Sequence, residues 1–152
     1  MKYWHYAAIQ YLNKPYKWAG NGPWEFDCSG FVLRVLRDVG LEYPDMTAGD
    51  LYKTLWEDAR KQKEYAQDGS IIFYGSSVQE IDHCALVMES QPSPPFGPPE
   101  KFIVEAGGAG SETQNMSQGE LLEYCKKHDA RVRIKPLDFR PRDQIVAILD
   151  VL

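Results

Sequence analysis

The chain has 152 residues, of which 43% are hydrophobic and 26% are charged, a composition typical of a globular protein. Its length predicts one domain over residues 1–152 with a single hydrophobic core. The net charge of −5, without any run of lysine or arginine, argues against nucleic acid and against an anionic membrane surface as partners.

The cysteines and the N-terminal residues indicate in which cellular compartment the protein is expected. Cys28, Cys84 and Cys125 are odd in number and include no CxxC pair, so they do not have the pattern of a disulfide framework. Residues 1–5 lack the apolar core of a signal peptide, and no apolar stretch has the length of a membrane span. We therefore expect a protein that is cytoplasmic as encoded, and a monomer by default, unless another system delivers it elsewhere.

Four segments have the residue spacing of amphipathic helices. They are Tyr3–Leu12, a second helix that begins at or near Cys28 and has its apolar face between Phe31 and Val39, Ala48 to about Lys63, and a short helix that begins at a cap formed by Ser117 and Glu120. The first ends before Pro15 and is expected to pack on the second, which Gly40 is placed to end.

From residue 68 onward, the hydrophobic pattern changes to that of short strands. The predicted strands are Ser70–Tyr74, Cys84–Met88, Phe102–Ala106, Arg131–Ile134 and Ile145–Val151. Because most helices precede the strands, the order predicts an α+β fold with an antiparallel sheet.

Two irregular stretches are candidates for functional loops. Gln91–Pro99 joins the second and third predicted strands and is either a stiff polyproline spacer or a wall of a substrate groove. Gly107–Ser111 follows the third strand outside any strand-to-helix GxGxxG context, so we interpret it as a flexible surface turn and not as a phosphate loop.

Cys28 is the residue around which a catalytic site is predicted. It lies between residues 13–24, rich in glycine, proline and asparagine, and the second helix, so its thiol is expected at a helix N-terminus. There the unpaired N–H groups and the positive end of the helix dipole favour the nucleophilic thiolate. The alternative is a small buried hydrophobe, but such a cysteine belongs inside an apolar stripe, whereas Cys28 stands between Asp27 and Ser29 at its beginning.

A thiolate nucleophile needs an imidazole partner within about 3 to 4 Å, and the chain contains three histidines. His5, in the first helix, and His128, in a polar run, are expected to face solvent. His83 opens the second strand, so its side chain leaves the sheet near one end, and we choose it as the general base. The alternative is a hydrogen-bonded sheet residue without a catalytic role.

The group that orients His83 is expected on a neighbouring strand, because adjacent strands lie about 4.8 Å apart. Glu105 supplies a carboxylate there; the alternative is an outward-facing strand residue. Asp82 is a rival, but consecutive strand residues point to opposite faces. The same divergence, and the lack of paired-ligand spacing, argue against a metal site of Cys28, His83 and Cys84, so neither a metal nor another cofactor is predicted.

Four blocks span most of the chain in a characteristic order and spacing. They are Tyr11–Gly20, Phe26–Phe31 (Phe-Asp-Cys-Ser-Gly-Phe), Asp68–Tyr74 and Asp82–Val87. These blocks resemble the NlpC-type cell-wall peptidase family. The resemblance implies a papain-like α+β fold, in which the cysteine helix packs on a sheet of five to six antiparallel strands that carries the histidine. It also implies hydrolysis of peptidoglycan stem peptides, typically at the bond from γ-D-glutamate to a diamino acid.

Position by position, Cys28 matches the family nucleophile and His83 its general base. The third family position is a polar residue, most often histidine, and Glu105 occupies it here. This is a departure, because a carboxylate adds negative charge beside the imidazole. Tyr16 matches a family tyrosine near the nucleophile, where a phenol helps to bind the oxyanion alongside the Cys28 N–H.

Asp27 and Ser29 match residues that in some members hold the free amino end of the substrate; for Asp27 a helix cap is the alternative. The same apparatus serves amidases and acyltransferases, which are alternatives to an endopeptidase. A further alternative is a phage tail or wall-associated module without catalysis. The expected partner is a stem peptide or muropeptide, and delivery to the wall would then depend on another system or on a phage.

Overall fold

The computed structural model describes residues 1–58, 61–90 and 97–152 of the chain. Their contacts form two compact units. The first consists of Met1, Ala48–Val104 and Ile134–Leu152, and the second of Lys2–Thr47 and Glu105–Arg133. The single domain over residues 1–152 therefore stays a prediction.

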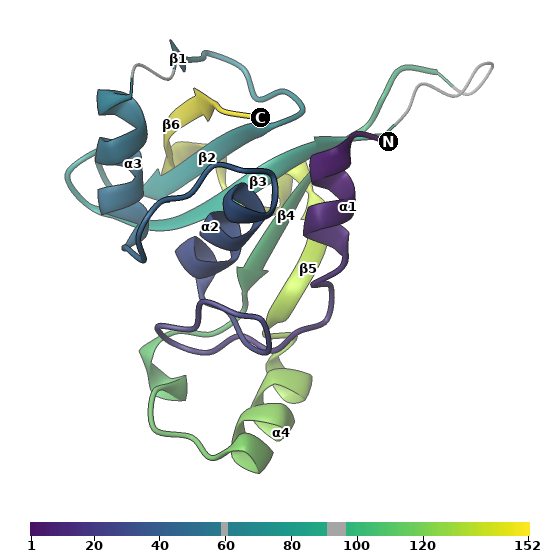
Figure 1. Ribbon diagram of the computed structural model, residues 1–152, viewed down its shortest axis with the longest axis vertical. Helices are drawn as coiled ribbons and strands as arrows, with labels where there is room; N and C mark the ends of the chain where they lie inside the picture. Colours follow the sequence, from purple (N-terminus) through teal and green to yellow (C-terminus); the bar gives the residue numbers. More distant parts are fainter. Residues whose placement is uncertain (59–60, 91–96) are drawn as a thin grey trace. The chain divides into compact units, whose positions relative to one another are not determined.

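The first unit is built on an antiparallel sheet whose strand order is β1-β6-β2-β3-β4-β5 (Figure 1). The strands are β1 (Lys61–Gln62), β2 (Ser70–Gly75), β3 (Ile81–Glu89), β4 (Lys101–Gly107), β5 (Arg131–Pro136) and β6 (Ile145–Asp150). The last residues of β4 and the first of β5 belong to the second unit. All five predicted strands are present, and the predicted α+β class with an antiparallel sheet is confirmed.

Both faces of this sheet are covered by apolar side chains. Residues that lie opposite each other on paired strands share a face, as Ile72 and Ala85 do on β2 and β3. On the other face, Phe73 packs against Tyr52 of α3 (Ala48–Glu57), with 5.4 Å between the ring centroids. The first face carries a cluster of Ala66, Ile72, Tyr74, Ala85, Val87, Ile103 and Ile148.

The third helix is shorter than predicted. We expected it to run from Ala48 to about Lys63, but α3 ends at Glu57, residues 59–60 lie outside the described ranges, and residues 61–62 form β1. β1 pairs with the end of β6, opposite Asp150 and Leu149. A tertiary contact therefore decides the conformation of two residues, lysine and glutamine, whose intrinsic preference is helical.

The second unit begins with two packed helices, α1 (Tyr3–Ile9) and α2 (Cys28–Asp38). The Tyr11 hydroxyl donates to Asp38 Oδ2 over 2.6 Å and so attaches the end of the first helical region to the end of the second. The predicted packing of the first helix on the Cys28 helix is confirmed. The stop at Gly40 is also confirmed, because its φ of +95° does not continue a right-handed helix.

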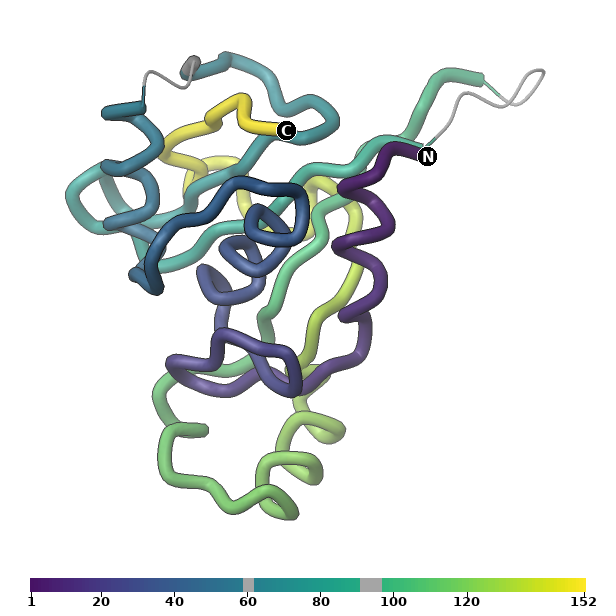
Figure 2. The backbone as a smooth tube through the Cα atoms, viewed as in Figure 1, coloured from purple at the N-terminus to yellow at the C-terminus, as the bar shows by residue number. Residues whose placement is uncertain are grey.

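The first helix ends earlier than predicted, at Ile9 and not at Leu12. Asn13 turns the chain with a φ of 73° and donates its N–H to the Val132 carbonyl over 2.9 Å. The Tyr16 N–H donates to the Ala130 carbonyl over 3.1 Å. These bonds attach the beginning of the segment 13–27 to residues near the start of β5. Figure 2 shows this segment as the purple tube that leads to α2.

The second unit is completed by α4 (Gln118–His128) and by the short 3₁₀ turn η1 (Ser111–Thr113). The predicted cap is confirmed, since Ser117 Oγ accepts from the Glu120 N–H over 3.3 Å. The predicted surface turn Gly107–Ser111 leads into η1, where Thr113 Oγ1 accepts from the Trp18 N–H over 2.8 Å. This bond attaches η1 to the loop that precedes α2.

The remaining segments bear on single predictions. The short turns η2 (Leu137–Phe139) and η3 (Arg142–Gln144) connect β5 to β6. Residues 91–96 of the proline-rich stretch Gln91–Pro99 lie outside the described residues, so its role stays a prediction. The three cysteines are present as thiols. No helix within the described ranges has the length and apolar character needed to cross a bilayer.

Candidate active site

Cys28 is the first residue of α2, where the sequence predicts it, and its side chain is partly exposed. Asp27 is the N-cap: its Oδ1 accepts from the Gly30 N–H over 2.7 Å and from the Ser29 hydroxyl over 3.4 Å. A side-chain cap of this kind is worth about 1 kcal/mol, because it satisfies an N–H group that a helix start leaves unpaired. The positive end of the helix dipole lies at the thiol and favours its ionisation.

Gly30 is required by a close approach of the preceding loop. A Cβ built on Gly30 would overlap the carbonyl oxygen of Gly20. That same oxygen accepts from the Asp27 N–H over 2.8 Å, so the loop and the first turn of α2 are joined at this point. Local structure therefore explains the first and last residues of the Asp-Cys-Ser-Gly motif. Asp27 caps the helix, and Gly30 lets the loop approach the helix closely.

Tyr16 lies beside the start of α2 through backbone pairing. The Lys17 N–H donates to the Phe26 carbonyl over 3.0 Å, and the Phe26 N–H donates to the Pro15 carbonyl over 3.1 Å. Burial, followed by the negative charges of Cys28, Asp27 and Glu112, raises the pKa of Tyr16 well above its usual range. Its phenol therefore stays protonated at neutral pH and is able to donate a hydrogen bond.

The pKa of Asp27 is raised, so its carboxyl group is a weaker acid than usual. Burial, followed by the charges of Cys28 and Asp45, raises the pKa of Asp27 to about 6, against the opposing effect of the hydrogen bonds from Gly30 and Ser29. Asp27 is thus ionised at neutral pH but titrates within the mildly acidic range. Ser29 is buried and its hydroxyl donates to the same carboxylate, so both residues take part in the cap.

His83 lies in the first unit, on β3, and is 9% exposed. It is paired in register with Tyr74 of β2, and the two ring centroids are 5.5 Å apart. Arg140 lies over the same tyrosine ring, with its guanidinium carbon 5.5 Å from the Tyr74 ring centroid. Cys28 and His83 belong to different units, so their catalytic pairing stays a prediction.

The other two histidines differ from each other. His128 is exposed, as expected, but the expectation that His5 faces solvent is wrong: it is 3% exposed. His5 Nδ1 accepts from the Lys2 N–H over 3.2 Å, and its ring packs edge-on against Trp4 with 4.4 Å between centroids. The sequence contains a signal for this burial, since His5 precedes the apolar Ala8 and Leu12 at the i+3 and i+7 spacing of a helix face.

Glu105 lies on β4 and is fully buried, so the alternative of an outward-facing carboxylate is wrong. Its Oε2 accepts from Arg133 of β5 twice, from Nε over 3.2 Å and from Nη2 over 3.0 Å. The role of Glu105 as the orienting group stays a prediction. Among the described residues, no cluster of three or more histidine, cysteine or acidic side chains has the geometry to hold a metal ion.

A comparison with known families decides what kind of chain carries this arrangement. The model of the NlpC/P60 family matches residues 13–126, which include the loop before α2, the strands β2 to β4 and most of α4. The chain belongs to the NlpC/P60 family. The resemblance stated from the sequence blocks is thereby confirmed.

This NlpC/P60 chain is similar to several curated proteins over part of their length. It is 37% identical over 76 residues to a probable endopeptidase p60 of Listeria innocua, a match that covers 49% of this chain and 15% of the relative. It is 27% identical over 122 residues to the murein DD-endopeptidase MepH of Escherichia coli, covering 79% of this chain and 40% of the relative. The chain thus spans less than half the length of these relatives.

Solved NlpC/P60 structures share the fold. The NlpC/p60 domain of the peptidoglycan hydrolase SagA has a TM-score of 0.58 at 20% identity, covering 96% of this chain and 94% of that domain. The NlpC1 structure from Trichomonas vaginalis has a TM-score of 0.58 at 15% identity, covering 97% and 42%. These similarities confirm the predicted papain-like α+β fold.

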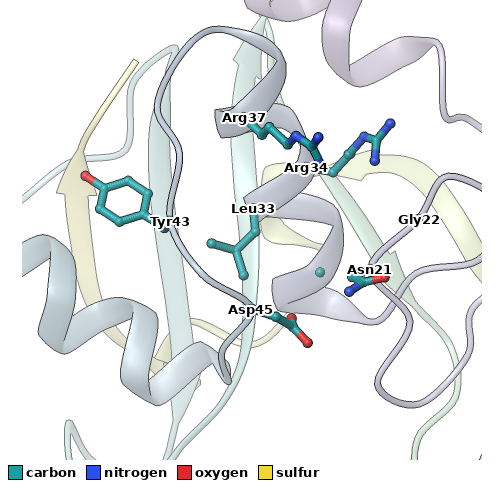
Figure 3. A pocket seen from close by; sticks show the side chains of 8 residues that line it. Asn21, Gly22, Leu33, Arg34, Arg37, Tyr43 and Asp45 are labelled. Carbon is teal, nitrogen blue, oxygen red and sulfur yellow. The ribbon is translucent and has the colours of Figure 1, made fainter.

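The NlpC/P60 chain also has a pocket of about 200 Å³ on the outer side of α2, which Figure 3 shows in close-up. It is lined by Asn21, Gly22, Gly30, Leu33, Arg34, Arg37, Tyr43 and Asp45. Leu33, Arg34 and Arg37 project from one helix face, whereas Cys28 lies on the opposite side of the helix by its 100° spacing. Cys28 is not among the residues that line this pocket.

Arg133 is the residue of the candidate site that sequence reasoning missed. It lies in a predicted strand between Val132 and Ile134, where an arginine is expected at the surface, yet it is 5% exposed. No local pattern distinguishes it from Arg131, two residues earlier. Only the position of Glu105, 28 residues away in the chain, gives this arginine a buried partner.

Proposed function

We propose that this protein is a cysteine hydrolase that cleaves peptidoglycan stem peptides, as an endopeptidase at the bond from γ-D-glutamate to a diamino acid. The observation that carries the proposal is the partly exposed thiol of Cys28 at the first position of α2, in a chain of the NlpC/P60 family. The endopeptidase names of the p60 and MepH relatives support the reaction class.

The proposed reaction is acyl transfer through a thioester. The Cys28 thiolate attacks the carbonyl carbon of the scissile amide, a C–S bond forms, and the carbonyl oxygen becomes an oxyanion. The C–N bond then breaks, and the His83 imidazolium protonates the leaving amine. Water attacks the thioester and gives its proton to His83, and the C–S bond breaks to release the acid and the thiolate.

The oxyanion is assigned two donors from the second unit. One is the backbone N–H of Cys28, in the first turn of α2, and the other is the phenol of Tyr16. The raised pKa of Tyr16 supports this role, because the phenol keeps its proton next to an anionic thiolate. A preoriented donor of this kind acts on charge that develops only as the reaction proceeds.

Asp27 and Ser29 are assigned the free amino end of the substrate. With the pKa of Asp27 at about 6, its carboxylate is ionised at neutral pH and attracts an ammonium group. The cap to Gly30 uses Oδ1 and holds the carboxylate in place. Binding of an amine and capping of α2 are thus compatible uses of one carboxylate.

A digest of purified muropeptides, analysed by mass spectrometry, tests the proposal. Wild type is expected to release a product with a new amine on the diamino acid, whereas Cys28→Ala is expected to release none and to keep its thermal unfolding midpoint. Cys84→Ala is the matched control, since it removes a fully buried thiol of the first unit. Full activity of Cys28→Ala would overturn the mechanism.

The same digest separates the alternatives. Free lactyl termini on muramic acid would indicate an amidase, and a new amide with an added amine would indicate an acyltransferase. A cross-linked muropeptide belongs in the assay because one relative is named a murein DD-endopeptidase. Intact muropeptides, together with a Cys28 that iodoacetamide labels no faster than an ordinary thiol, would indicate a non-catalytic module.

A further inference from the structure

The ion pair between Glu105 and Arg133 is buried, and Arg133 contacts one carboxylate oxygen through two of its nitrogens. The two side chains are 0% and 7% exposed. Arg133 directs two N–H groups at a single oxygen, Oε2, from Nε at 3.2 Å and from Nη2 at 3.0 Å. Two charge-assisted donors on one oxygen hold that oxygen of the carboxylate in place.

The guanidinium of Arg133 is itself held from behind. Its Nη1 donates to the Asp129 carbonyl over 2.9 Å and lies 3.4 Å from Asp129 Oδ2. Asp129 is the C-cap of α4 and adopts the left-handed conformation, with a φ of 53°. The end of α4 thus determines where the guanidinium points, and the guanidinium determines where the Glu105 carboxylate lies.

Stability is a weak reason for such a pair. Burying two charges costs desolvation energy, and apolar residues of similar volume often replace a buried ion pair without loss of stability. A buried carboxylate without a cation would also take up a proton. Arginine is suited to hold a carboxylate both ionised and oriented, because its fork of donors is planar and rigid whereas a lysine offers a single point charge.

We propose that Arg133 is a positioning residue: it keeps Glu105 ionised and in one orientation. This carboxylate then serves the third catalytic role predicted from the sequence, which is to orient the imidazole of His83. The inference rests on the proposed function. It also accounts for the departure from the family pattern at this position, since the guanidinium offsets the negative charge that a carboxylate brings.

The test compares kcat and KM on a muropeptide for Glu105→Gln, Arg133→Met, Arg133→Lys and the double variant Glu105→Gln/Arg133→Met. Each of the first two is expected to lower kcat by about 10- to 100-fold with little change in KM. The double variant is expected to be no slower than Arg133→Met alone, because residues that act as a unit are not additive. Arg133→Lys is expected to recover stability but only part of kcat.

Arg131→Met is the matched control, because Arg131 lies on the same strand and pairs with Asp129 over 2.7 Å but not with Glu105. It is expected to stay within about twofold of wild type. Iodoacetamide labelling of Cys28 is expected to remain intact in every variant. A double variant that recovers wild-type kcat together with its unfolding midpoint would overturn the inference, since the pair would then be structural only.

Losses that multiply in the double variant would overturn it as well, because Arg133 would then act independently of Glu105. If Arg133→Met does not fold, Arg133→Lys and the double variant carry the test, since neither leaves a buried carboxylate without a cation. The two proposals fail differently: activity that survives Cys28→Ala removes the proposed function, whereas activity that needs Cys28 but tolerates Arg133→Lys removes only this inference.

Discussion

The start of α2 and the β4–β5 ion pair each hold a carboxylate, and they do so by different means. Asp27 uses neighbours in the chain: it accepts from Gly30 N–H and from Ser29, and burial raises its pKa to about 6. Glu105 is buried completely and is paired with a guanidinium 28 residues away. A partly exposed carboxylate is thus stabilised by local hydrogen bonds, whereas a fully buried one needs a cation.

The difference has a consequence for stability. A local cap is worth about 1 kcal/mol, since water takes over when the cap is lost. A buried charge that loses its partner has no water to replace it. Variants that remove the Asp27 cap should therefore lose less free energy of unfolding than variants that remove the cation beside Glu105.

The largest effect on folding is expected for Arg133→Met. It leaves the Glu105 carboxylate buried without its cation, so the free energy of unfolding should fall by about 3–5 kcal/mol. Urea unfolding followed by circular dichroism measures it, and Asp27→Ala, with an expected loss of about 1 kcal/mol, is the comparison. Equal losses in the two variants would contradict the distinction between the regions.

A second test measures how much stability is lost when a residue at the start of α2, Gly30, is substituted. Gly30→Ala is expected to lower the free energy of unfolding by about 1–3 kcal/mol, because the new Cβ overlaps the Gly20 carbonyl oxygen and the helix must shift. Gly119→Ala in α4 is the matched control, as a Cβ there meets no atom within 4 Å. The control should stabilise by about 0.5–1 kcal/mol.

A third variant separates catalysis from folding at the start of α2. Tyr16→Phe keeps the buried ring but removes the phenol, and it is expected to lower kcat by about 10- to 100-fold through loss of one oxyanion donor. The unfolding midpoint should stay close to that of wild type. A wild-type kcat in this variant would assign the oxyanion to other donors.

The smallest effect is expected from the titration of Asp27. Its folded-state pKa, about 6, is raised above the unfolded value of about 3.9, so the folded state binds the extra proton between these pH values. The stability of wild type relative to Asp27→Asn should therefore be greatest below about pH 4 and should decrease as the pH rises through about 6. Thermal unfolding at several pH values measures this, and a constant difference would contradict the raised pKa.

Several features of this protein were accessible from sequence because they depend on short-range geometry. The start of α2 at Cys28, its stop at Gly40 and the Ser117 cap follow from residues that lie within one helical turn of the feature itself. The strands β2, β3 and β4 follow from apolar runs that are buried on both faces. Helix starts and buried strands are local decisions, so local patterns predict them.

Other features were decided only by tertiary structure. Lys61 and Gln62 became a strand because the end of β6 offered them hydrogen bonds, and His5 became buried because its face of α1 packs inward. The pairing of Arg133 with Glu105 required two strands to bring together side chains far apart in the chain. Sequence patterns record what a residue prefers by itself, whereas burial and ion pairing depend on which distant surface it meets.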